Sequence, residues 1–145
     1  MSPPRLQRTL RLDARGLGKV LGDLEARIMT AIWEVRCDSP ARAIHERVAR
    51  HHPVHLLTVV TVLNKLVAKR LVKRVRHNGL LHFGARHTRP EFDAYVSRRL
   101  VEGVLGFSRD LVTASLVDVL AETDPEALEE LARLVKSRLA EEEEK

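Results

Sequence analysis

The sequence predicts a mainly α-helical protein with one small β-hairpin. Apolar residues recur at intervals of three and four over most of the 145 residues, which is the period of an amphipathic helix. Around residues 71–86 the pattern changes to alternation, and Asn78-Gly79 separates two short alternating runs. Asn-Gly is typical of a two-residue hairpin turn because both residues tolerate positive φ.

The composition fits one ordinary domain or two small ones that share a core. Hydrophobic residues make up 44% and charged residues 31%, so the chain can bury a core and stay soluble. Aromatic residues at 3% argue against a single-strand binder that stacks bases. One cysteine, Cys37, excludes a disulfide framework, and we expect it to be a small buried residue. With no long apolar run and no secretory stretch in residues 1–19, we expect a cytoplasmic protein without membrane contact.

The charge is distributed unevenly along the chain. Residues 1–90 contain 18 Lys and Arg against 6 Asp and Glu, a net charge of +12, whereas residues 91–145 contain 7 against 14, a net charge of −7. A surface rich in Lys and Arg attracts a polyanion, and nucleic acid is the first candidate. The acidic part favours a protein partner, although uneven solvation without any partner would give the same totals.

Three helices are expected to follow an N-terminal arm. Residues 1–20 are rich in Pro and Arg and are interpreted as a flexible basic arm, which could contact DNA phosphates or a minor groove. Apolar periodicity predicts a first helix over about 23–36. Ser39 is expected to cap a second helix that starts at Pro40 and runs to about Arg50. The third helix covers about 56–70.

The third helix and the hairpin together predict a winged helix-turn-helix domain over residues 21–88. Leu56, Val59, Leu63 and Leu66 should face the core, which leaves a short-chained face without acidic residues. Such a face can enter the major groove, where hydroxyl and amide groups read base edges and apolar groups contact thymine methyls. Cations around it can bind phosphates. The candidate DNA-binding residues are Arg42, Leu57, Thr58, Val60, Thr61, Asn64, Lys65, Lys69, Arg74, Arg76, His77 and Asn78.

Residues 89–145 are predicted to form a helical dimerisation domain with an acidic tail. Thr88 and Thr123 are each followed three residues later by a Glu, with a Pro between, which is the pattern of a capping box, so each should cap the start of a helix. Another helix is expected between these two, over about 108–121. These helices are too few to bury their apolar stripes alone, which favours packing against a second copy over an intramolecular bundle. The candidate dimerisation residues are Phe92, Tyr95, Leu100, Leu111, Leu116, Leu128, Leu131 and Leu134.

Two segments resemble the penicillinase-repressor family, the BlaI/MecI/CopY repressors. Leu21-Gly22-Asp23-Leu24-Glu25, followed by Ile28-Met29 and Ile32-Trp33, is similar to the opening of that family. The stretch TVVTVLNKL at 58–66, followed by Leu71-Val72, is similar to its recognition helix and exit. The resemblance runs over about 21–139. It implies a dimeric winged-helix transcriptional repressor on a dyad operator, with Thr58 and Thr61 on groove-facing positions.

The sequence departs from that family at several positions. Arg70 stands where the family often has Gly, so the turn into the hairpin is expected to differ, and Val60 stands where some members carry Arg or Met. The Asn-Phe cleavage site of β-lactam-responsive members aligns with Val119-Leu120, and the clustered cysteines of copper-responsive members are missing. The inducer or sensor therefore stays unassigned.

Three other hypotheses are kept beside a DNA-binding repressor. His51, His52 and His55 precede the third helix, and His77, His82 and His87 lie in the hairpin region, so metal or haem could regulate the same fold. No histidine pair has helical ligand spacing with acidic support, so no cofactor is assigned. A protein-interaction adaptor that does not read DNA is another possibility. An enzyme is the remotest, since no phosphate loop, carboxylate pair or nucleophile arrangement is recognisable.

Overall fold

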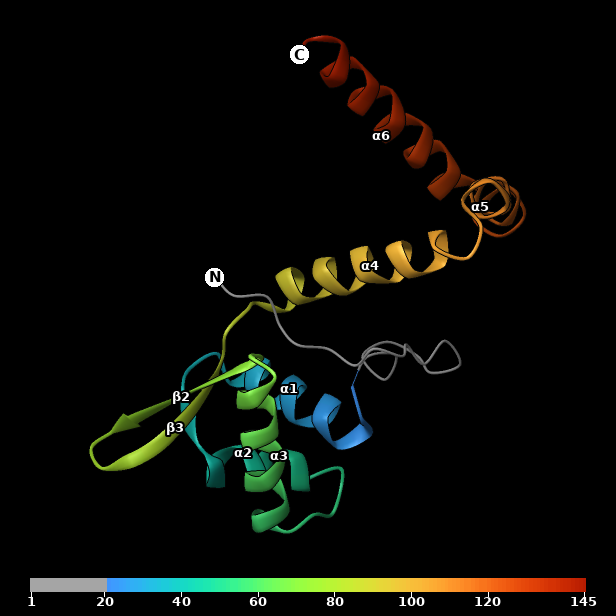
Figure 1. The fold of residues 1–145 in the computed structure, drawn as a ribbon. Helices are drawn as coiled ribbons and strands as arrows, with labels where there is room; N and C mark the ends of the chain where they lie inside the picture. The colour runs from blue at the N-terminus through green and yellow to red at the C-terminus, as the bar shows by residue number, and fades with distance from the viewer. Residues whose placement is uncertain (1–20) are drawn as a thin grey trace. The chain divides into compact units, whose positions relative to one another are not determined.

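The computed structural model describes residues 21–145 (Figure 1). The basic arm expected over residues 1–20 lies outside the described residues. The chain divides into two compact units after Val96. The division falls later than the predicted boundary at 88/89 because Phe92 and Val96 pack against the core of the N-terminal unit.

Three helices and a three-stranded antiparallel sheet make up the N-terminal unit. The helices are α1 (Asp23–Val35), α2 (Ala41–Ala49) and α3 (Leu56–Ala68), which agree with the predicted ranges within two residues. The strands are β1 (Ser39–Pro40), β2 (Val72–His77) and β3 (Leu80–Ala85), in the order β1-β3-β2. Three helices followed by a hairpin confirm the winged helix-turn-helix fold, with β2 and β3 as the wing.

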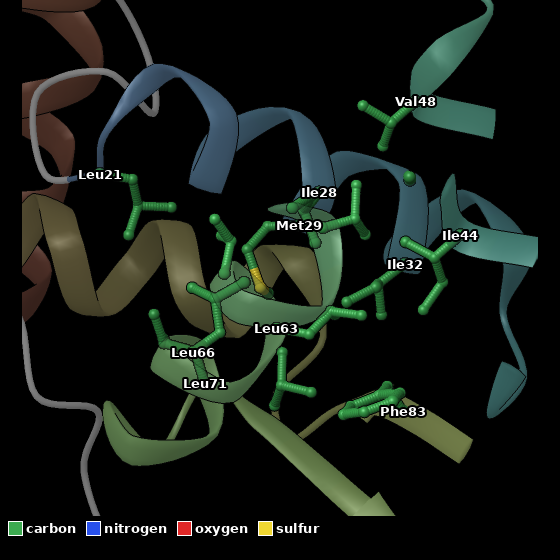
Figure 2. Close-up of a cluster of buried hydrophobic side chains, with 14 of the residues drawn as sticks. Leu21, Ile28, Met29, Ile32, Ile44, Val48, Leu63, Leu66, Leu71 and Phe83 are labelled. Atoms are coloured by element: carbon green, nitrogen blue, oxygen red, sulfur yellow. The ribbon is translucent and has the colours of Figure 1, made fainter. Parts of the chain in front are cut away.

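The core of this unit is formed where the helices meet the inner face of the sheet. Figure 2 shows Ile28, Met29 and Ile32 of α1 in one cluster with Leu63 and Leu66 of α3 and with Phe83 of β3. Val62, which the sequence analysis did not place inside, is buried as well, whereas Leu56 is half-buried. The buried hydrophobic residues are Leu21, Ile28, Met29, Ala31, Ile32, Ile44, Val48, Val59, Val62, Leu63, Leu66, Leu71, Val72, Phe83 and Phe92.

The segment before α2 differs from the prediction. Ser39 does not cap the helix: Ser39 and Pro40 form β1 and pair with Phe83 and His82 of β3, and the Ser39 hydroxyl donates to the Cys37 carbonyl at 3.2 Å. Pairing with β3 holds Ser39 extended, so Pro40 becomes the residue before the first helical turn. Cys37 is exposed, contrary to expectation, because it lies in the turn that leaves α1.

The end of α3 is a Schellman motif. The Leu71 N–H donates to the Leu66 carbonyl and the Arg70 N–H donates to the Val67 carbonyl, both at 3.0 Å. Arg70 occupies the left-handed position of this motif, with φ 62°. Arg70 thus adopts the backbone conformation that Gly favours.

The wing has the predicted hairpin turn. Asn78 and Gly79 have φ of 51° and 78°, the positive values that a two-residue turn of this kind requires. The strand register pairs Arg74 with Phe83 and Val72 with Ala85. Since directly paired residues share a face, the buried Val72 and Phe83 show that Arg74 lies on the face of the wing that meets the helices.

Helices α4 (Arg89–Leu105), α5 (Arg109–Thr123) and α6 (Pro125–Glu143) complete the chain. The Thr88 hydroxyl accepts from the Glu91 N–H at 3.2 Å, as the first capping box predicts. The second prediction was wrong by one residue, since the Asp124 carboxylate accepts from the Ala127 N–H at 3.1 Å and caps α6. Thr123 ends α5.

Phe92 does not belong to a surface stripe. Its side chain is 1% exposed in the N-terminal core, and its ring centroid lies 5.4 Å from that of Trp33. The assignment of Phe92 to dimerisation is therefore corrected. Within residues 21–145, no helix has the length and apolar character that a membrane span requires.

Candidate nucleic-acid interface

The segment that forms α3 and the wing contains no acidic residue. No Asp or Glu occurs between Glu46 and Glu91, a segment with ten Lys and Arg. This segment includes all of α3 and both wing strands. Its charge has one sign, so it attracts a polyanion. Two of its cations meet acidic side chains from elsewhere in the chain: Lys73 lies 3.6 Å from Asp38, and Lys69 pairs with Glu25.

The outer face of α3 has the predicted mixture of short side chains. Leu57 is 76% exposed, and Thr58, Thr61, Asn64 and Lys65 are exposed on the same helix. Val60, also predicted for this face, is half-buried. An exposed leucine beside hydroxyl and amide groups suits the mixed apolar and polar edge of a major groove.

The Thr61 hydroxyl is partly engaged within its own helix. Its Oγ1 donates to the Leu57 carbonyl at 3.0 Å. The hydroxyl proton is used in this bond, so the oxygen offers its lone pairs and the methyl group to any partner. Thr61 can therefore accept from a base amino group or contact a thymine methyl.

The wing and α3 are joined by a hydrogen bond between two predicted DNA-binding residues. Arg74 Nη1 donates to Asn64 Oδ1 at 2.7 Å, and both side chains are exposed. Sequence reasoning placed both residues at the interface but missed their contact. The signal was present in the alternation of β2, because Arg74 is two residues from the inward-facing Val72.

The tip of the wing presents exposed polar groups. Arg76 Nη1 donates to the Gly79 carbonyl at 3.2 Å, which holds the guanidinium against the turn. The rings of His77 and His82 meet edge to face with centroids 5.4 Å apart. With Asn78 also exposed at the turn, the tip can reach a phosphate backbone or a neighbouring groove.

Two predicted phosphate contacts have different surroundings. The Lys69 ammonium lies 2.6 Å from Glu25 Oε2, and the two side chains are 26% and 14% exposed. This ion pair ties the end of α3 to α1, so a phosphate contact by Lys69 would first require it to open. Arg42, in the first turn of α2, is exposed.

The histidines do not converge on one point. Among residues 21–145, no three His, Cys, Asp or Glu side chains are grouped closely enough to hold a metal ion. His45 Nε2 lies 2.6 Å from the Val54 carbonyl and connects α2 to the loop before α3. That contact was not anticipated from the sequence.

The fold and the segment without acidic residues define a winged helix-turn-helix protein with a basic wing. A family model described as Penicillinase repressor matches residues 21–137. The chain belongs to the penicillinase repressor family.

Two curated relatives and one solved structure are similar to this chain. The relatives are both transcriptional regulator BlaI, from two strains of Mycobacterium tuberculosis, each 32% identical over 74 residues, or 51% of this chain and 54% of the relative. The chain spans about half the length of the curated relatives it matches. A solved mutant of Lactococcus lactis ZitR is similar to this chain with a TM-score of 0.41 at 14% identity, over 94% of this chain and 82% of that one.

Proposed function

We propose that this protein is a cytoplasmic transcriptional repressor that binds a dyad operator in double-stranded DNA as a homodimer. The observation that carries the proposal is the acid-free segment between Glu46 and Glu91, which folds into an exposed helix face and a wing that touch each other. Membership of the penicillinase repressor family and the similarity to the regulator BlaI support a role in transcription.

In this proposal α3 enters the major groove. Thr61 and Asn64 contact base edges, and the exposed Leu57 contacts a thymine methyl. Lys65 and the wing cations bind phosphates, which fix the register of the helix without reading sequence. The wing tip reaches the adjoining backbone.

The homodimer is supported by the apolar surface of the C-terminal unit. Neither α5 nor α6 has a buried residue. Phe107, between α4 and α5, is 87% exposed. A second copy would bury such a surface, and a twofold dimer presents two recognition helices related by symmetry. The exposed large apolar residues of this unit are Val101, Val104, Phe107, Leu111, Leu116, Val117, Val119, Leu134, Val135 and Leu139.

Selection from duplexes with a randomised central segment tests the proposal. The full chain is expected to enrich two inverted half-sites about one helical turn apart, as a symmetric dimer requires. Light scattering on the same sample should report two copies per duplex. Absence of enrichment, or solitary subunits both free and with DNA, would refute the proposal.

The adaptor hypothesis makes a different prediction for the helix face. Replacing both Thr61 and Asn64 with Ala removes the two polar groups but no charge. A DNA reader should then lose discrimination between the selected duplex and a scrambled one, by about 0.5–1.5 kcal/mol for each single hydrogen bond to a base. An adaptor should show no discrimination before or after the change.

A further inference from the structure

The contact between the wing and α3 determines which end of the Asn64 amide faces outward. Arg74 Nη1 lies 2.7 Å from Asn64 Oδ1. A guanidinium has donors and no acceptor, so the amide end that meets it must be the oxygen. The amide nitrogen, with its two donors, is therefore turned away from the wing.

We propose that Arg74 is a positioning residue that makes Asn64 a donor-presenting reader of base edges. This inference rests on the proposed function of α3 as a recognition helix. An unrestrained asparagine can offer its oxygen and its nitrogen together, and in that way it binds adenine at two points. With the oxygen held by Arg74, the favoured partners are the major-groove acceptors of guanine, of thymine and of adenine N7. Cytosine presents an amino donor there and is disfavoured.

The geometry of the wing explains why Arg74 can do this. Arg74 pairs with Phe83 across the sheet, and Phe83 is buried against the helices. Arg74 therefore extends from the same face of the wing and reaches along α3. Arg76 also lies on this face, but its guanidinium donates to the Gly79 carbonyl in its own turn. The two arginines have equal charge and different partners, so Arg76 provides a matched control.

The test repeats the duplex selection with variants of the full chain. Comparing wild type with Asn64→Ala identifies the base position that depends on Asn64. At that position the wild type is expected to disfavour cytosine by about two- to tenfold, the worth of one hydrogen bond. Arg74→Met should bring this ratio close to one, because the amide is then free to turn. Arg76→Met should lower affinity and leave the ratio unchanged.

A further variant tests the polarity directly. Asn64→Asp keeps the contact with Arg74 but presents an acceptor in place of the amide donors, so cytosine should become the preferred base. Because the exchanged side chains are exposed, all variants should keep the circular dichroism spectrum of the wild type.

The outcomes separate this inference from the proposed function. If the wild type enriches inverted half-sites but Arg74→Met keeps the wild-type ratio, the inference is wrong and the proposed function stands. If Asn64→Ala changes no base position, the inference is wrong and so is the base contact proposed for Asn64, whereas the proposed repressor role stands. If the wild type enriches no sequence, both are refuted.

Discussion

Replacing Arg70 with Gly should stabilise the N-terminal unit. Arg70 has φ 62° in the turn after α3, and a left-handed conformation costs an L-residue about 1–2 kcal/mol. Gly adopts it without that cost, but its greater freedom in the unfolded chain offsets about 0.5–1 kcal/mol of the gain. The net increase in the free energy of unfolding should be about 0.5–1 kcal/mol. For a unit of this size, that corresponds to a rise in melting temperature of about 4 °C.

Denaturant unfolding followed by tryptophan fluorescence provides the assay, because Trp33 is the single tryptophan and packs against the core of this unit. Ala68→Gly is the matched control: Ala68 is the exposed last residue of α3 and is helical, so Gly there should lower the free energy of unfolding by up to about 0.5–1 kcal/mol. Opposite signs for the two Gly variants are expected. If Arg70→Gly destabilised the protein as Ala68→Gly does, the assignment of strain to the turn would be wrong.

Three other substitutions test the corrections to the sequence analysis. Phe92→Ala should lower the free energy of unfolding by about 3–5 kcal/mol in denaturant titration, since Phe92 fills the core. If the substitution instead weakened self-association and left the free energy of unfolding unchanged, Phe92 would belong to a dimer interface after all. Lys69→Met should lower the free energy of unfolding by about 1–3 kcal/mol, because the Glu25 carboxylate then lacks its cation. If the substitution weakened salt-dependent DNA binding but left the free energy of unfolding unchanged, this structural role of Lys69 would be wrong. Asp124→Ala should remove the N-cap of α6, lower the stability of that helix by about 1 kcal/mol and so speed amide hydrogen exchange in its first turn. Unchanged exchange would show that Asp124 is not the cap.

The sequence predicted the elements that depend on local signals. Helical periodicity located α1, α2 and α3 within two residues, and Asn78-Gly79 located the hairpin turn. The outer face of α3 followed from the same periodicity, since residues opposite a buried stripe must be exposed. Val60 was the exception, because it lies at the edge of that stripe and is half-buried.

The features that the sequence did not predict depend on distant contacts. Ser39 has the local signature of a helix cap, but it pairs with Phe83, more than forty residues later in the chain. Phe92 lies on the apolar face of an amphipathic helix. Periodicity identifies that face but does not reveal whether it packs against the core of the same chain or against a second copy. At the start of α6, Thr123 and Asp124 are both good caps, and their order alone does not decide between them.

The salt dependence of DNA binding tests the central claim most directly. If the basic surface of α3 and the wing binds a duplex, the logarithm of the affinity should fall linearly with the logarithm of the salt concentration, because the DNA releases counterions when protein cations neutralise its phosphates. Lys65→Met should reduce that slope by about one, and Lys69→Met, whose cation is paired with Glu25, should leave it unchanged. An affinity that does not vary with salt would contradict the account.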